Sequence, residues 1–102
     1  MNDPEDQAWL KEMINSLLEN MATRVENLER LMQTKDPKDL QSELHQIKGV
    51  AANFGLAALS EVVIKAESLA KAGEIDSSIT EGKKIASVWD STKQELEKKF
   101  ST

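Results

Sequence analysis

The stretch Leu44–Leu59, "LHQIKGVAANFGLAAL", spans the junction between two predicted helices. Apolar residues recur every three or four positions from Leu40 to Phe54, which is the spacing of one face of an α-helix. Gly55 then occupies the position where a residue in the left-handed conformation commonly ends a helix. A second stripe with the same spacing begins at Leu59. Because the connection between the two stripes is so short, these helices are predicted to be antiparallel neighbours.

Two helices begin upstream with the same start signal, an aspartate followed by a proline. Asp36 precedes Pro37, and Asp3 precedes Pro4. An aspartate just before a helix accepts hydrogen bonds from its first N–H groups, and proline suits the first helical position because it lacks an N–H. The predicted helices are residues 4–34 and 37–54. The apolar stripe of the first consists of Leu10, Ile14, Leu18, Met21, Val25, Leu28 and Met32.

Two further helices are predicted downstream. Gly73, in the sequence "KAGE", supplies the end signal of the third helix. The next segment, "DSSITE", offers Asp76, Ser77 or Ser78 as the cap of the fourth. Ser78 and Glu81 also have the spacing of a capping box. The third helix is expected at residues 56–72, with an apolar stripe of Leu59, Val62, Ala66 and Leu69. The fourth is expected at residues 77–100, with a stripe of Ile85, Val88, Trp89, Thr92, Leu96 and Phe100.

Together, these signals predict an all-α fold, an antiparallel up-down-up-down four-helix bundle. Glycine and proline are scarce, and neither strand-like alternation nor a low-complexity segment interrupts the helical pattern. A chain of 102 residues suits one small domain, assigned to residues 1–102 with a core at about 8–100. The initiating methionine and the well-formed ends favour a free-standing module.

Charge and composition exclude several classes of function. The chain has 13 lysines and arginines against 18 aspartates and glutamates, a net charge of −5, which is the wrong sign for a nucleic-acid-binding surface. It has no cysteine, and therefore neither disulfides nor thiolate chemistry. Its acidic start is unlike a secretory signal, and no apolar run approaches the ~20 residues that span a membrane. We expect a cytoplasmic monomer with no nucleic-acid or membrane partner.

His45 is the only histidine of the chain, and the helical spacing predicts that it faces water. The centre of the apolar stripe falls between Leu44 and Ile47, and His45 lies roughly 140° away from it around the helix. A lone exposed histidine is most often of no functional consequence. The neighbours expected on this surface are Gln41, Lys48, Gly49 and Ala52.

Two of these neighbours argue for a function. Gly49 lies in the middle of the helix, where glycine costs about 1 kcal/mol relative to alanine, so a benefit such as clearance for a partner is expected. Lys48 places a cation where an anion carried by the imidazole would lie. A zinc site would need at least three protein ligands, and a histidine-assisted hydrolase would need an activated serine; the sequence supports neither. The remaining chemistry is the imidazole itself as a nucleophile.

A wider pattern consists of His45, Lys48, Gly49, Gly55, Leu59 and Glu67. It closely resembles the pattern of the histidine-containing phosphotransfer (HPt) domains of multistep phosphorelays. The likeness covers about residues 8–100, because that family is also a small antiparallel four-helix bundle with its histidine exposed midway along one helix. The chain departs from the family at Leu44, where alanine is common, but this position belongs to the core stripe.

The resemblance implies that His45 accepts a phosphoryl group from a receiver-domain phosphoaspartate and passes it to another receiver aspartate. Lys48 would stabilise the phosphate, and Glu67 would orient the imidazole by accepting a hydrogen bond from Nδ1. By the same resemblance Gly49 would admit the receiver's loops. Gln41, Ala52 and the exposed parts of the first and second helices around His45 are assigned to the receiver docking surface from their adjacency alone.

The resemblance also implies the partners and cofactors. The partners would be response-regulator receiver domains, with a hybrid histidine kinase as a further candidate. The chain would need no cofactor or metal of its own, because the receiver would bring Mg²⁺. It would have no kinase activity, since it lacks a glycine-rich nucleotide site.

Two alternatives remain open. The phospho-accepting domain of a chemotaxis-type histidine kinase is similar, but that group often has a second histidine on the third helix, where this chain has Ile64. A structural, protein-binding bundle would leave His45 incidental and Glu67 an ordinary surface charge. Histidine-kinase dimerisation domains resemble a different pattern, with an acidic residue after the histidine and a proline soon beyond. Here Gln46 follows, and no proline occurs after Pro37.

Overall fold

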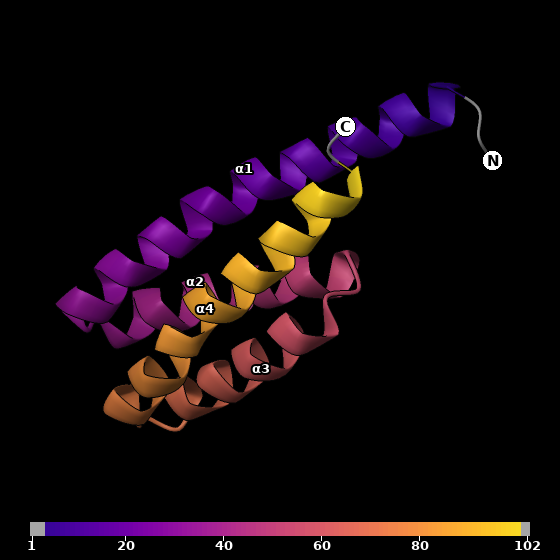
Figure 1. Cartoon of the computed structure of the whole chain (residues 1–102). Helices are drawn as coiled ribbons and strands as arrows, with labels where there is room; N and C mark the ends of the chain where they lie inside the picture. Colours follow the sequence, from indigo (N-terminus) through magenta and orange to yellow (C-terminus); the bar gives the residue numbers. More distant parts are fainter. Residues whose placement is uncertain (1–3, 101–102) are drawn as a thin grey trace.

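The computed structural model describes the backbone of residues 4–100 and the side chains of residues 8–98. Its helices are α1 (Pro4–Thr34), α2 (Pro37–Asn53), α3 (Ala57–Lys71) and α4 (Ile75–Phe100). Consecutive helices run in opposite directions (Figure 1), so the predicted all-α up-down-up-down bundle is confirmed. The cap predicted at Asp3 and the side chain of Phe100 lie outside the described residues.

The connections between the helices are built by capping residues that the sequence predicted. The Asp36 carboxylate accepts hydrogen bonds from the backbone N–H groups of Lys38 and Asp39, at 3.1 and 3.2 Å. Gly55 and Gly73 follow α2 and α3 with φ of 65° and 82°, a left-handed conformation that glycine adopts without strain. In both turns the residue after the glycine donates its N–H to a carbonyl in the last turn of the helix. The chain therefore reverses within a few residues at each junction.

The four helices close into a ring of neighbours. α3 packs against α2 and α4, and α1 packs against the same two helices on the other side. The molecule measures 49 × 20 × 19 Å, and α1, the longest helix, continues past the others at its N-terminal end (Figure 1). Within residues 4–100, no helix has both the length and the apolar character needed to cross a membrane.

Each helix contributes one face to a single hydrophobic core. In α2 the buried residues are those of the predicted stripe, namely Leu40, Leu44, Ile47 and Ala51. In α3 the stripe is wrong in part, because Val63 and Ala70 are buried whereas Val62 and Leu69 are only half-buried. The reason is that Val62 and Val63, like Leu69 and Ala70, are adjacent apolar residues, so helical spacing fits either member of each pair and packing selects the second. Glu67 lies on the same buried face of α3.

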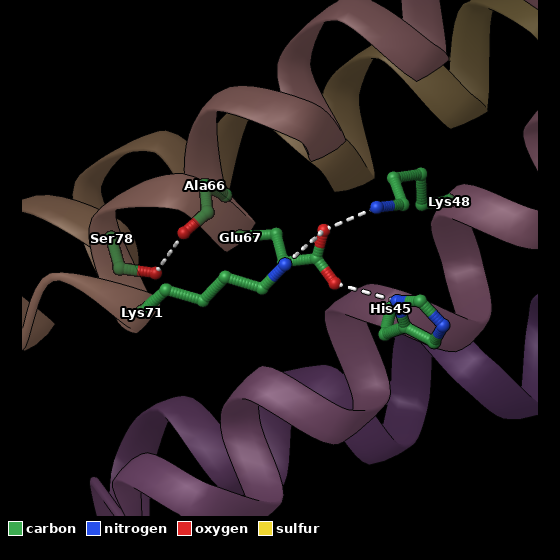
Figure 2. Close-up of polar contacts among 6 residues, drawn as sticks. All are labelled: His45, Lys48, Ala66, Glu67, Lys71 and Ser78. Carbon is green, nitrogen blue, oxygen red and sulfur yellow. Dashed lines mark hydrogen bonds and ion pairs between the residues drawn. The ribbon is translucent and has the colours of Figure 1, made fainter.

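The structure corrects the predicted start of α4. The helix begins at Ile75, two residues earlier than expected, so the caps predicted at Asp76, Ser77 and Ser78 lie inside it. Ser78 is 1% exposed, and its hydroxyl donates a hydrogen bond to the carbonyl of Ala66 in α3 at 2.7 Å (Figure 2). Ser78 therefore ties α4 to α3 instead of starting a helix.

Candidate functional site

His45 lies in the middle of α2 on the side away from the core. Leu44 and Ile47 are fully buried, whereas the His45 side chain is 63% exposed. The helical spacing predicts this exposure. Successive residues of a helix are turned by about 100°, which places His45 on the side opposite the apolar stripe. The imidazole is thus presented to solvent by a helix that is anchored in the core on its opposite face.

Glu67 reaches His45 from the neighbouring helix α3. Its side chain is 4% exposed, and its oxygen Oε2 lies 2.8 Å from Nδ1 of His45. Its other oxygen, Oε1, accepts a hydrogen bond from Nζ of Lys48 at 2.6 Å (Figure 2). Lys48 lies one turn after His45 on α2. A single buried carboxylate therefore connects two α2 side chains to α3.

The environment of Glu67 keeps its carboxyl group ionised. Burial raises the pKa, but hydrogen bonds from Lys48 and His45 and the charges of Lys48 and Lys71 outweigh it, so the pKa of Glu67 lies below its ordinary value. An ionised carboxylate only accepts hydrogen bonds, which assigns the ring proton to Nδ1 of His45. In the neutral ring the lone pair then lies on Nε2, which points away from Glu67 (Figure 2) and has no hydrogen-bond partner among the described side chains, those of residues 8–98.

A shallow hollow lies beside His45, between α2 and α3. The residues that line it are Lys38, Gln41, Ser42, His45, Glu67 and Lys71. Of the predicted docking residues, Gln41 lies in this hollow, whereas Gly49 and Ala52 are exposed further along α2. One wall of this hollow belongs to α2 and the other to α3, whereas the predicted docking surface combined the first and second helices. Among the described side chains, no three histidine, cysteine, aspartate or glutamate residues gather to hold a metal ion.

Lys71 is a charged residue of this site that the sequence reasoning missed. Its Nζ lies 3.8 Å from Oε1 of Glu67, and its side chain is 55% exposed. The available signal was its position four residues after Glu67, a favourable spacing for an ion pair on one helix. Such pairs are common on helix surfaces, so the spacing alone did not indicate a functional role.

The variant Glu67→Gln is expected to lose less stability in acid than the wild type. The pKa of Glu67 is lower in the folded protein than in the unfolded chain, so folding is favoured when the group is ionised. This contribution is complete above the unfolded-state pKa of about 4.3 and is lost as the pH falls through the folded-state pKa. Urea denaturation from neutral pH to about pH 3 measures it. A wild-type advantage that does not shrink on acidification would contradict the prediction.

The chain was also compared with known protein families. A family model described as the Hpt domain matches residues 12–98, a range that includes His45, Lys48 and Glu67. Searches of curated proteins and of solved structures gave no significant match. Because the family model covers most of the chain, the protein belongs to the Hpt domain family, whose members carry phosphoryl groups in histidine–aspartate phosphorelays.

Proposed function

We propose that this chain accepts a phosphoryl group on His45 from a receiver-domain phosphoaspartate and passes it to another receiver aspartate. The observation that carries the proposal is an exposed imidazole whose Nδ1 is hydrogen-bonded to Glu67 and whose Nε2 has no partner within the described part of the chain. In the first step the Nε2 lone pair attacks phosphorus, an N–P bond forms, and the P–O bond to the aspartate breaks. The aspartate carboxylate is the leaving group. The reverse of these steps delivers the phosphoryl group to the second receiver.

Glu67 supports this chemistry by its charge and its position. When Nε2 bonds to phosphorus while Nδ1 keeps its proton, the ring becomes positively charged. A carboxylate oxygen 2.8 Å from Nδ1 stabilises that charge as it develops. The same hydrogen bond restricts rotation of the ring. We therefore assign to Glu67 the role of orienting the imidazole and stabilising its positive charge.

Lys48 is assigned to phosphate stabilisation. Its side chain is 32% exposed, and it lies one turn from His45 on the same helix face. Charge-assisted hydrogen bonds from an ammonium group to phosphoryl oxygens are strong, and they favour the phosphorylated state. The remaining catalytic groups, including Mg²⁺, are proposed to come from the receiver, so that the chain needs no cofactor of its own.

The receiver is proposed to dock over the exposed face of α2. Gly49 faces open space there, because a Cβ atom added to it would meet no described atom within 4 Å apart from its chain neighbours and its own helix backbone. Packing within the chain therefore gives no reason for a glycine at a position where it costs about 1 kcal/mol relative to alanine. Clearance for a partner does give a reason. Gln41 and Ala52 belong to the same proposed docking surface.

The variants Gly49→Ala and Gly49→Gln should separate folding from docking. Both place a better helix former in open space, so both are expected to raise the free energy of unfolding by about 0.5–1 kcal/mol in urea denaturation. Gly49→Gln also adds a long side chain to the docking surface and is expected to slow transfer from a phosphorylated receiver about tenfold. Equal transfer rates for Gly49→Gln and the wild type would contradict the docking role.

The proposed function is tested by locating the phosphate. The purified chain is incubated with a panel of receiver domains carrying radiolabelled phosphoaspartate. Label should appear on the chain, disappear in acid and persist in base, as expected for a phosphorus–nitrogen bond. Peptide mapping should place it on the fragment that contains His45, the only histidine. Acid-stable label, or no label from any receiver of the panel, would count against the proposal.

The chemotaxis-type alternative differs in the phosphoryl donor. It requires that the chain be labelled by ATP together with an isolated kinase ATP-binding domain. The position where a second histidine is expected in that group holds Ile64, whose apolar side chain is 52% exposed on α3. This residue gives no support to the alternative. Label from kinase domains combined with none from receivers would nevertheless favour it.

A further inference from the structure

Two lysines lie close to the same oxygen of Glu67. Nζ of Lys48 is 2.6 Å from Oε1, and Nζ of Lys71 is 3.8 Å from the same atom. The two side chains come from different helices, and Lys71 approaches the carboxylate from the side opposite Lys48 and His45 (Figure 2). Lys48 therefore makes the hydrogen bond, while Lys71 lies at the outer limit of an ion pair.

Phosphorylation of His45 would change the charges around Lys48. A phosphoryl group carries about −1.5 to −2 charges near neutral pH and three acceptor oxygens, more than the single charge of Glu67. Lys48 lies one turn from His45 and is attracted to that larger charge. If Lys48 leaves Oε1, Glu67 loses its shortest contact although it is only 3% exposed. Oε2 would keep its hydrogen bond with Nδ1 of His45, but Oε1 would be a buried charged oxygen without a hydrogen-bond donor, which is unfavourable.

We propose that Lys71 is a positioning residue, which takes over the contact with Oε1 of Glu67 when Lys48 turns to the phosphoryl group on His45. The inference rests on the proposed function, because it concerns the phosphorylated state of the same site. Lys71 does not contact the reacting atoms. It keeps Glu67 ionised and in place, so that Glu67 continues to accept the hydrogen bond from Nδ1.

The position of Lys71 suits this role. It follows Glu67 by four residues, the order and spacing in which a glutamate and a lysine pair best on a helix. Because both residues belong to α3, their contact does not depend on the side chains of α2. The Lys71 side chain is 55% exposed, so it can shorten the 3.8 Å distance without disturbing the core.

The test compares the contribution of Lys71 to stability in the two states. Wild type and variants are phosphorylated with phosphoramidate, which transfers its phosphoryl group to the imidazole and releases ammonia, so no receiver is needed. Unfolding by urea is followed at mildly alkaline pH, where phosphohistidine persists. Lys71→Met should increase the unfolding equilibrium constant of the phosphorylated protein about fivefold more than that of the unphosphorylated protein, as expected for a partly exposed ion pair.

Three further variants serve as controls. Lys65 is also an exposed lysine of α3, but it pairs with Glu81 at 3.4 Å, so Lys65→Met should affect both states equally. Lys71→Arg keeps the positive charge and should behave like the wild type. In a Lys48→Met background, Lys71 is the remaining lysine beside Glu67 in both states. The effect of Lys71→Met should then no longer depend on phosphorylation.

The possible outcomes separate this inference from the proposed function. The inference would be overturned if Lys71→Met changed the unfolding equilibrium constant equally in the phosphorylated and unphosphorylated proteins. It would also be overturned if the effect of Lys71→Met still depended on phosphorylation in the Lys48→Met background. Both measurements use chemical phosphorylation, so they stand whether or not a receiver transfers phosphate to His45. Failure of every receiver to label the chain would contradict the proposed function alone. An imidazole that phosphoramidate does not label would overturn both proposals.

Discussion

The variant His45→Gln is expected to take up no acid-labile phosphate from a phosphorylated receiver, while its fold is retained. The electrons of an amide nitrogen are delocalised into the carbonyl group, so glutamine has no nucleophilic nitrogen and no N–P bond forms. The substitution removes no core packing, because the His45 side chain is 63% exposed. Glu67 keeps its contacts with Lys48 and Lys71, so the loss of stability should stay within about 1–2 kcal/mol, the contribution of one hydrogen bond to a charged group.

Radiolabel transfer and circular dichroism on the same preparations check this prediction. A matched control moves the imidazole by one residue, in the double variant His45→Gln, Gln46→His. Gln46 is exposed, so the new imidazole is also in water, but it is turned about 100° around the helix from Glu67. We expect this variant to remain unlabelled by receivers. Undiminished labelling of the single variant His45→Gln would show that another side chain carries the phosphate.

Glu67→Ala is expected to slow transfer from a phosphorylated receiver by about 10–100-fold, the range known for removing the group that orients a metal-binding histidine. In the wild type Oε2 of Glu67 lies 2.8 Å from Nδ1 of His45. The alanine variant loses this hydrogen-bond acceptor and also the negative charge that stabilises the phosphorylated ring. Glu67→Gln keeps an acceptor oxygen of similar reach and loses only the charge. The expected order of rates is therefore wild type, then Glu67→Gln, then Glu67→Ala, measured in rapid-quench time courses.

The control for Glu67 is a glutamate of the same helix that does not reach His45. Glu61 is exposed on α3, so Glu61→Ala should leave the transfer rate unchanged. Removal of Glu67 also leaves Lys48 without its hydrogen-bond acceptor, which lowers stability. Rates are therefore compared at a temperature where urea denaturation shows every variant to be folded. Equal rates for Glu67→Ala and the wild type would contradict the orienting role.

Features of the fold that depend on local signals were predictable from the sequence. Asp36 and Pro37 start α2, and Gly55 and Gly73 adopt the left-handed conformation after α2 and α3. Each of these signals acts within four or five residues, through the N–H and C=O groups that a helix end leaves without partners. The exposure of His45 was predictable for a similar reason, since its angle to the core stripe depends only on the repeat of a single helix.

Features that depend on how helices pack against each other were not predictable in the same way. Ser78 has the sequence signature of a cap, but it is buried in α4 and donates to a carbonyl of α3. Val63 and Ala70 are buried in place of their apolar neighbours Val62 and Leu69, a choice that packing against the other helices makes and the apolar pattern leaves open. Lys71 gains its proposed role only from the contact between Glu67 and His45, which belong to different helices.

The sequence by itself therefore determined the four helices, their order and the exposure of one imidazole, because these follow from interactions between residues close together in the chain. Only the tertiary structure decided that the carboxylate of Glu67 lies 2.8 Å from His45 Nδ1 and 2.6 Å from Lys48 Nζ. These distances depend on the register between α2 and α3. A shift of one residue moves a side chain by about 1.5 Å along the helix axis and about 100° around it, which is enough to separate these groups.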